Sequence, residues 1–333
     1  MTRTTGGLFE QLVDEDRLDE AARVTVRGKR RRADVATFLF RRESELRELR
    51  AALVDARWRH GAFDLLFLHD PKPRVIARAS VLDRVVHTAV ARLVEAVLER
   101  SLSDADYACR TGRGTHRALL RILELVRRHA WFVHLDVRSY FPSIRIELVR
   151  SLLRRRIRDE RFLQVVDRIL ESGRGLYDDR HVRAFARLDP DWPPPGEGLP
   201  IGAYTSQVLA AHVVPLGLDS HVARELRVPG YVRYVDDLFL FGDSRSALRA
   251  ARDDVGRYLD ERLGLRLKRP GARPRSCSGR LDALGHLVTR SGIEPLPRHA
   301  RRMGARAARY VRGTGPAIPA EGWAGALGSV LCV

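Results

Sequence analysis

Apolar positions recur at helical spacing in the first third of the chain. Between residues 8 and 60, apolar side chains such as Phe38 and Leu46 stand among paired charges, and their spacing is typical of an amphipathic helix. The segment from Val81 to Leu102 has the same period, with one face made of valines and leucines. We therefore predict that both segments are helical.

The middle of the chain contains shorter runs that are typical of strands. Arg74 to Ala77 follows two prolines, and Trp131 to Val137 is almost continuously apolar, as buried strands are. From Tyr231 to Phe241, two β-rich runs flank an adjacent pair of acids, which is the pattern of a hairpin with carboxylates at its tip. Thr205 to Leu226 indicates an apolar helix that Pro215 should kink.

Three acids stand at the ends of these apolar runs. Asp136 follows the first run, and Asp236 and Asp237 separate the two halves of the hairpin. Acids in such places are costly unless a cation neutralises them. Two-metal phosphoryl transfer needs this arrangement, and Mg²⁺ suits carboxylate oxygens. Taken alone, an adjacent Asp pair is also typical of an ordinary turn.

The charge of the chain narrows the choice of partner. Its 333 residues include 60 Lys and Arg against 42 Asp and Glu, a net charge of +18. Such a field attracts polyanions, of which nucleic acid is the commonest. A compositional bias explains why almost all the cations are arginine, but not their excess. The basic run from Arg27 to Arg32 is either a solvated face or a surface that follows phosphates.

Several other classes of protein are disfavoured. No apolar run approaches the roughly 18 residues that a membrane span needs, so we expect a cytoplasmic protein without membrane contact. Cys109, Cys277 and Cys332 are an odd number without paired spacing, which argues against a disulfide framework or a cysteine zinc site. The histidines show no metal-binding spacing, and no glycine-rich phosphate loop is present.

Several segments together resemble a known family. The matches to motifs A, B and C of reverse transcriptases are Leu135-Asp136-Val137-Arg138-Ser139-Tyr140-Phe141-Pro142-Ser143-Ile144, Gly198-Leu199-Pro200-Ile201-Gly202-Ala203-Tyr204-Thr205-Ser206-Gln207 and Tyr234-Val235-Asp236-Asp237. The segments that resemble the fingers of bacterial members are 72–76, 83–87 and 106–116, and Leu281 to Gly285 resembles motif E. The segments match the family in order and in spacing. The resemblance covers roughly residues 20 to 310.

The resemblance implies an α+β fold of the right-hand polymerase type. It implies an N-terminal helical extension over 1–60, fingers and an antiparallel-sheet palm over 61–290, and a short helical thumb over 291–333. The last segment ends in a Gly-rich apolar tail and lacks the longer basic helix expected of a thumb.

The resemblance also implies roles for single residues. Asp136, Asp236 and Asp237 would be catalytic and, with the backbone carbonyl of Val137, would bind two Mg²⁺ ions. The residues implied to bind the incoming dNTP are Lys72, Arg74, Arg78, Phe141, Ile201 and Gly202. Phe141 falls where the family places the aromatic ring that excludes a ribose 2′-OH, and the alternative is an ordinary core phenylalanine. Ser206, Gln207 and Tyr234 would contact the primer-template, although Thr205 and Ser206 are also suited to capping the following helix.

The residue at position 201 narrows the choice among the subfamilies of reverse transcriptases that the chain resembles. Most reverse transcriptases carry Gln before the motif B glycine, whereas this chain carries Ile201. This pattern resembles the enzymes of diversity-generating retroelements, which copy an RNA template with errors concentrated at adenines. The resemblance implies a structured RNA template and a small basic helical accessory protein. Loss of the amide at position 201 removes a donor near the nucleotide, so reduced fidelity is our hypothesis.

The motif D region is less clear. After Leu265-Arg266-Leu267, the family's lysine corresponds to Lys268, or Arg269 or Arg273 takes its place. Lys268 is then either a general acid or a solvated loop lysine.

The sequence therefore predicts an RNA-directed DNA polymerase that copies an RNA template into cDNA. Two alternatives stay open. One is a retron-, group II intron- or defence-type bacterial reverse transcriptase. The other is an RNA-binding scaffold without catalysis, which the intact acids disfavour.

Overall fold

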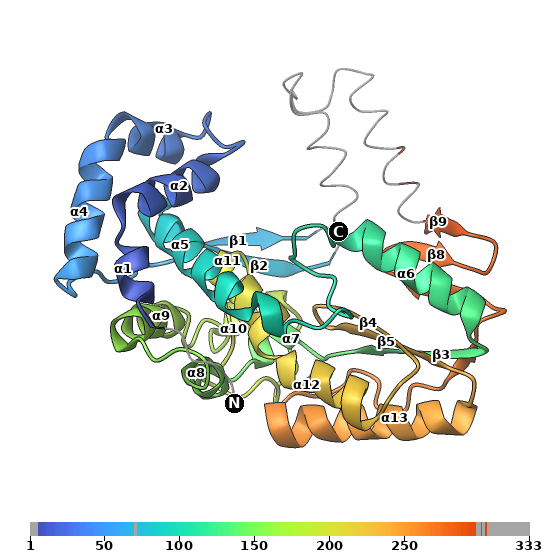
Figure 1. Cartoon of the computed structure of the whole chain (residues 1–333). Coiled ribbons are helices and arrows are strands. Elements are labelled where there is room, and N and C mark those ends of the chain that lie inside the picture. Colours follow the sequence, from blue (N-terminus) through green and yellow to red (C-terminus); the bar gives the residue numbers. More distant parts are fainter. Residues whose placement is uncertain (1–5, 70–71, 298–300, 302–303, 305–333) are drawn as a thin grey trace. The chain divides into compact units, whose positions relative to one another are not determined.

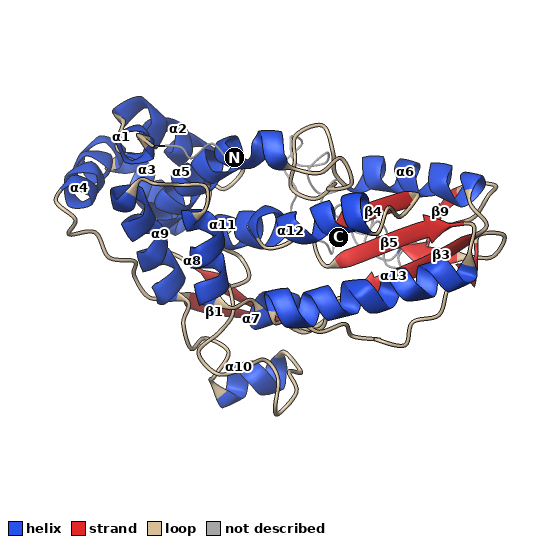
Figure 2. Cartoon of the chain, turned by 60° about the horizontal axis from the view of Figure 1, so that its bottom comes forward, coloured by secondary structure: helices blue, strands red, loops and turns tan. Residues whose placement is uncertain are grey.

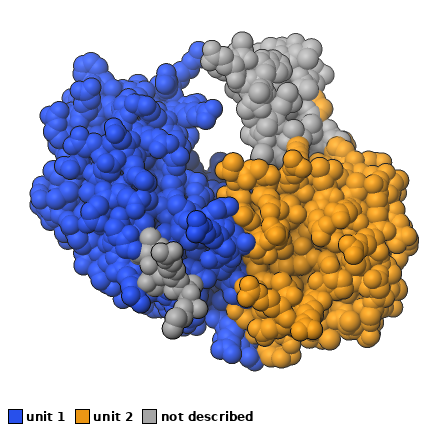
Figure 3. All heavy atoms as spheres, in the orientation of Figure 1, with its two compact units in different colours: residues 1–102, 138–217, 259–266 blue, residues 103–137, 218–258, 267–333 orange. Residues whose placement is uncertain are grey.

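The structure is a computed structural model that describes residues 6–69, 72–297, 301 and 304. Most of the predicted thumb and Cys332 lie outside the described residues. The chain divides into two compact units, coloured separately in Figure 3. Unit 1 comprises Met1–Leu102, Arg138–Gly217 and Leu259–Arg266, and unit 2 comprises Ser103–Val137, Leu218–Tyr258 and Leu267–Val333. The domain boundaries expected from the resemblance are not tested by this division and stay a prediction.

Unit 1 is mostly helical. Its elements are α1 (Leu8–Leu12), α2 (Glu15–Val26), α3 (Ala33–Phe40), α4 (Arg42–Val54), β1 (Asp64–Leu68), β2 (Arg74–Arg78), α5 (Val81–Leu98), η1 (Glu99–Ser101), α7 (Tyr140–Ser143), α8 (Ile146–Arg154), α9 (Glu160–Ser172), α10 (Arg180–Phe185), α11 (Tyr204–Val208) and the π-helical turns η2 (Leu209–Val213) and η4 (Leu259–Leu263). The predicted helices and the strand at Arg74 are thus confirmed, except that residues 55–60 are not helical.

Local chemistry explains where the N-terminal helices begin and end. The Asp14 side chain accepts a hydrogen bond from the Arg17 N–H and caps α2. The helix buries Leu18 and Val26 on its apolar face, and Gly28, with φ +70°, then turns the chain. The basic run from Arg27 to Arg32 therefore forms the connection between α2 and α3 (Figure 1).

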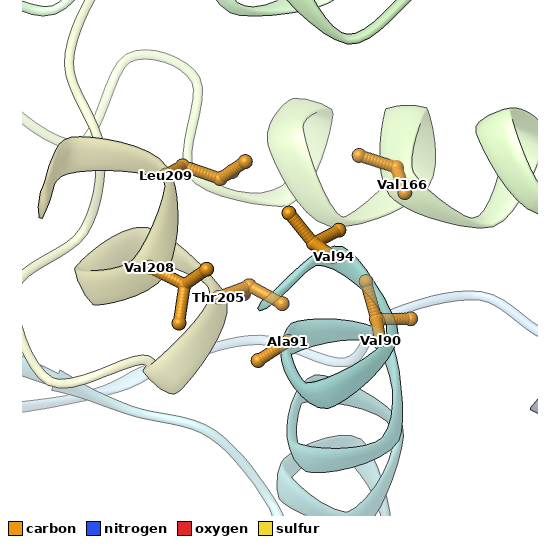
Figure 4. Close-up of a pocket in the computed structure, with 7 residues that line it drawn as sticks. All are labelled: Val90, Ala91, Val94, Val166, Thr205, Val208 and Leu209. Carbon is orange, nitrogen blue, oxygen red and sulfur yellow. The ribbon is translucent and has the colours of Figure 1, made fainter. Parts of the chain in front are cut away.

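Helix α5 forms the apolar centre of unit 1. It packs against α2 and α11, and Val85, Val86 and Val90 are almost fully buried. The gap between α5, α9 and α11 is lined by side chains such as Val94, Val166 and Leu209 (Figure 4). It has no space for a water molecule and is therefore a packing seam rather than a ligand site.

Unit 2 is built on an antiparallel sheet. Its elements are α6 (Thr115–Arg128), β3 (Trp131–Asp136), η3 (His221–Glu225), β4 (Gly230–Tyr234), β5 (Asp237–Gly242), α13 (Arg245–Tyr258), β6 (Arg275–Ser276), β7 (Leu281–Ala283), β8 (His286–Val288) and β9 (Ile293–Pro295), and α12 (Leu216–Ser220) spans the boundary between the units. The main sheet has the order β4-β5-β3-β6, and β7-β8-β9 form a second sheet. Helix α6 lies on one face of the main sheet and α13 on the other (Figures 1 and 2).

The predicted kink at Pro215 is confirmed as a break in the helix. The chain is helical through η2, the helical hydrogen-bond pattern is interrupted at Val214 and Pro215 although Val214 keeps helical backbone angles, and the pattern resumes with α12. Proline lacks the N–H that would continue the helical hydrogen bonds. Among the described helices, none combines the length and the apolar character needed to cross a bilayer.

Candidate active site

The acids predicted from the sequence meet at one end of the main sheet. Strand β5 pairs with β3 and with β4, and its first residue, Asp237, is opposite Asp136 on one side and Tyr234 on the other. Directly opposed residues of antiparallel strands project from the same face. Tyr234, Asp237 and Asp136 therefore form one row across three strands.

Asp236 lies next to this row, in the two-residue turn that joins β4 to β5. Its neighbour Val235 has φ +54°, a left-handed conformation that is costly for a β-branched side chain. The Val137 N–H donates a hydrogen bond to the Asp236 carbonyl over 3.3 Å. The turn is therefore attached to the end of β3, where the predicted metal-binding residues Asp136 and Val137 lie.

Two cationic or polar side chains hold the carboxylates of this row. The Lys268 Nζ lies 2.6 Å from Asp136 Oδ2, and the Lys268 N–H donates to the Asp136 carbonyl over 2.8 Å. Lys268 is thus an ion-pair partner of a predicted catalytic acid, and its side chain is about half-exposed.

His134 is the second of these side chains, and sequence reasoning missed it. Its Nε2 lies 2.6 Å from Asp237 Oδ1, and its ring stacks on Phe239 with centroids 4.4 Å apart. The only signal in the sequence was its position two residues before Asp136, which places both side chains on the same face of a strand.

The donor set can be compared with what Mg²⁺ requires. Asp136 and Asp237 supply carboxylate oxygens, the ligand type that Mg²⁺ prefers, from facing strands, and both side chains are about one-third exposed. In the described part of the chain, no three or more His, Cys, Asp or Glu side chains are already arranged around a common metal position. The residue types therefore fit magnesium, while two of the carboxylates contact Lys268 and His134 in this conformation.

The residues predicted to bind the dNTP lie in unit 1. Lys72 and Arg74 are exposed, whereas Arg78 forms an ion pair with Asp64 on the neighbouring strand. The Ala77 N–H donates to the Ile201 carbonyl over 2.7 Å, so motif B lies directly against β2.

Gly202 explains how this approach is possible. It has φ +113°, and a Cβ at this position would lie 2.7 Å from Ile76 Cγ2 and 3.0 Å from the Ala77 carbonyl oxygen. The glycine is therefore required by the contact with β2 within the protein itself, in addition to any contact with nucleic acid.

The side chain of Phe141 is half-buried. Its ring lies edge-on to Tyr140 at 5.9 Å, and the Tyr140 hydroxyl donates to the Ala210 carbonyl over 2.7 Å. The Leu199 N–H donates to the Phe141 carbonyl over 2.8 Å. The segment after motif A is therefore held by motif B and by the helix that follows it.

The residues after Gly202 differ in exposure. Gln207 is exposed, whereas Ser206 is only 3% exposed and Thr205 is buried with its hydroxyl bonded to His87. The N-cap of α11 is Ala203. The alternative in which Thr205 or Ser206 caps this helix is therefore wrong, because both residues lie inside it.

Comparison with known proteins agrees with this geometry. Residues 69–269 match the family model described as reverse transcriptase (RNA-dependent DNA polymerase). The chain is 29% identical over 100 residues to an uncharacterized 91 kDa protein in the cob intron of Schizosaccharomyces pombe, covering 30% of this chain and 12% of that protein. It is 28% identical over 107 residues to protein YkfC of Escherichia coli, covering 31% of this chain and 28% of that protein. A putative COX1/OXI3 intron 1 protein of Saccharomyces cerevisiae is 22% identical over 150 residues, covering 44% of this chain and 17% of that protein. The chain thus spans less than a third of the length of each of these relatives.

A solved structure confirms the predicted fold class. The structure of apo telomerase from Candida tropicalis superimposes with a TM-score of 0.51 at 9% identity, covering 71% of this chain and 49% of that one. The mixed helix and sheet fold with antiparallel sheets is therefore that of a right-hand polymerase. Because the family model matches more than half of the residues, including Asp136, Asp236 and Asp237, the chain belongs to the reverse transcriptase (RNA-dependent DNA polymerase) family.

Proposed function

We propose that the protein is an RNA-directed DNA polymerase that extends a primer on an RNA template. The observation that carries this proposal is the row formed by Asp136 and Asp237 on facing strands, with Asp236 in the adjoining turn. The reaction is attack of a primer 3′-hydroxyl on the α-phosphate of a dNTP, with release of pyrophosphate. Positioning and electrostatic stabilisation supply most of the rate in such transfers.

Each group of residues has a proposed task in this reaction. Asp136, Asp236 and Asp237, with the carbonyl of Val137, would hold two Mg²⁺ ions, which when bound neutralise phosphate charge and activate the attacking oxygen. Lys72 and Arg74 are exposed cations that would bind the triphosphate. Tyr234 and the exposed Gln207 would contact the primer-template, whereas burial of Ser206 disfavours a direct contact there.

The basic segment, residues 27–32, supports RNA as the partner. Arg27, Arg30 and Arg31 are exposed and form no ion pair with any residue that the structure describes, whereas Arg32 and Arg84 share the single carboxylate of Asp34. Cations therefore outnumber acids at this surface, and a polyanion would relieve their mutual repulsion.

The surroundings of Lys29 show the same excess of positive charge. Its Nζ donates to the Thr25 carbonyl over 3.2 Å. Burial, together with repulsion from Arg84 and Arg32, lowers the pKa of Lys29. An RNA phosphate beside these groups would oppose this shift.

We expect the double variant Arg30→Ala/Arg31→Ala to bind single-stranded RNA more weakly than the wild type. Two lost phosphate contacts should reduce the slope of log K against log salt by about 1.4. The measurement is fluorescence anisotropy with a labelled RNA over a range of salt concentrations. The matched control is Arg23→Ala/Arg57→Ala, which removes two exposed arginines that already have Asp partners. Equal losses in both double variants would favour the solvated-face interpretation.

For the biological role, we propose the error-prone enzyme of a diversity-generating retroelement. The support is Ile201 in motif B, whose backbone is fixed by its bond to Ala77 while its side chain is half-exposed. In this role, the enzyme would act in the cytoplasm with a structured RNA and a small basic helical accessory protein. The alternative is an intron-type enzyme, which the names of two relatives favour.

We expect Ile201→Gln to lower misincorporation opposite template adenine by about fivefold, the equivalent of one net hydrogen bond of ~1 kcal/mol. The amide would restore a donor near the nucleotide. The measurement is sequencing of cDNA made by each variant on a defined RNA, with Ile201→Val as the control that keeps an apolar side chain. Equal error rates for the wild type and the Gln variant would show that this position does not set fidelity.

A further inference from the structure

A segment that the proposed function leaves unused lies beside the catalytic hairpin. Residues 106–116 resemble a fingers segment in sequence, and in unit 2 the first two of them, Asp106 and Tyr107, pair with β4. Asp106 forms a parallel bridge with Arg233. The Arg233 N–H donates to the Ala105 carbonyl over 2.7 Å, and the Tyr107 N–H donates to the Arg233 carbonyl over 3.0 Å. The start of the segment therefore pairs with β4, which is the edge strand of the main sheet and leads into Asp236.

The side chain of Arg233 is buried between two acids. It is 1% exposed, and Asp106 and Asp219 are 0% and 1% exposed. Its Nη2 lies 2.9 Å from Asp106 Oδ2 and 2.8 Å from Asp219 Oδ2, and its Nε lies 2.8 Å from Asp219 Oδ1. The Tyr231 hydroxyl also donates to Asp219 Oδ1 over 2.9 Å. We call these four residues the Arg233 network.

Arg233 stays charged despite its burial. Burial alone would lower the pKa of Arg233, and the attraction of Asp219 and Asp106 more than reverses this effect, so its pKa is held above the ordinary value. The same burial, with the negative charge of Asp219, raises the pKa of Tyr231. A cation held by two carboxylates has few other low-energy positions, because any displacement leaves a buried charge unpaired.

Stability alone is a weak explanation for such a network. Buried ion triads are often no more stabilising than apolar side chains of similar volume, and their best-attested use is to select one geometry. The end of β4 needs one backbone geometry, because the turn that carries Asp236 follows it directly. Arg233 lies two residues before Val235, whose left-handed backbone is strained, and three residues before Asp236.

We propose that Arg233, bound to Asp106 and Asp219, is a positioning residue that fixes β4 so that the strained turn presents Asp236 and Asp237 beside Asp136. This inference rests on the proposed function for its consequence, but not for its structural content. The guanidinium binds Asp219 through two nitrogens, which a lysine cannot reproduce. The network thus acts on the metal-binding acids through the backbone and touches no substrate.

The test compares three full-length variants with the wild type. Arg233→Lys keeps the positive charge but loses the contact of two nitrogens with the Asp219 carboxylate. The apolar variant Tyr231→Phe/Arg233→Met/Asp106→Leu/Asp219→Leu removes all the buried charges and keeps a filled core. Leu248→Ala is the control, because Leu248 is 2% exposed and its Cδ2 lies 3.6 Å from the position that a Cβ on Gly242, at the far end of β5, would occupy. It weakens the same unit without touching the network.

Three measurements separate positioning from general stability. The first is hydrogen exchange of the Val137 amide, which donates to the Asp236 carbonyl. The second is binding of Mn²⁺ alone, followed by electron paramagnetic resonance. The third is the Mg²⁺ dependence of primer extension. Urea unfolding supplies the global stability of each variant.

We expect Arg233→Lys and the apolar variant to bind Mn²⁺ about tenfold more weakly, as loss of groups that orient metal ligands does. Their Val137 amides should exchange faster than that of Leu248→Ala at equal global stability. An apolar variant with wild-type stability, wild-type Mn²⁺ affinity and wild-type exchange would overturn the proposal. If the wild-type protein neither binds Mn²⁺ nor extends a primer, the proposed function fails, and the exchange comparison still decides the role of Arg233.

Discussion

Asp236→Asn is expected to reduce primer extension on an RNA template by on the order of 10³-fold, because it removes one of the charges that would hold the metal ions. Asn has nearly the same size as Asp, so the turn between β4 and β5 should keep its shape. RNA affinity should stay within about twofold of wild type, since the arginines proposed to bind phosphates are unchanged. The measurement is single-turnover extension of a labelled primer with Mg²⁺, beside RNA binding by anisotropy.

Asp243→Asn is the matched control for this variant. Asp243 follows the other end of β5, is exposed, and accepts hydrogen bonds from the Ala130 N–H and the His129 ring. The same chemical change there should leave extension near the wild-type rate. If Asp236→Asn extended primers as fast as Asp243→Asn, Asp236 would not be a catalytic acid. If wild type and both variants bound RNA equally and none extended a primer, the scaffold alternative would be correct.

The strands that carry the acids were predictable because their signal is local. Trp131 to Val137 and the two halves of the hairpin are short apolar runs, and turn chemistry separates them. The pattern also predicted that the hairpin tip lies beside the end of this strand, with Asp236 next to Asp136. The register that places Asp237 opposite Asp136 was not predicted, because a shift of one residue along a strand is not marked in the sequence. The helical spacing of residues 8–54 was equally local.

The groups that hold these acids were not predictable, because they depend on contacts between distant parts of the chain. Lys268 is 132 residues from Asp136 in sequence, and nothing near it specified the register of the loop after Leu267. Asp106, Asp219 and Arg233 each resemble an ordinary surface charge when taken singly. Only the fold shows that they are buried together.

The ion pair between Lys268 and Asp136 has a consequence for the site. A carboxylate oxygen that binds an ammonium group over 2.6 Å is not available to another cation at the same position. The Lys268 backbone is fixed by its own hydrogen bond to Asp136, but its side chain is about half-exposed. Rotation of the flexible Lys268 side chain can therefore move the ammonium group away from Asp136 while the backbone of the loop stays in place.

Phe141→Ala is expected to increase the incorporation of ribonucleotides relative to deoxyribonucleotides by about 100-fold, the upper range for discrimination by shape in an apolar pocket. Phe141 is half-buried beside Tyr140, so its ring has an exposed part that can contact a sugar. A smaller side chain would leave space for the 2′-hydroxyl. The measurement is kcat/KM for one dNTP and its matching NTP on the same RNA template.

The control is Tyr140→Phe, which removes the hydrogen bond from the Tyr140 hydroxyl to the Ala210 carbonyl but keeps the ring beside Phe141. If discrimination depends on the Phe141 ring itself, the control should change the ratio of the two kcat/KM values by no more than about threefold, the equivalent of less than 1 kcal/mol. Equal loss of discrimination in both variants would show that packing around α7, rather than the ring of Phe141, excludes the ribose. An unchanged ratio in Phe141→Ala would show that another residue performs the discrimination.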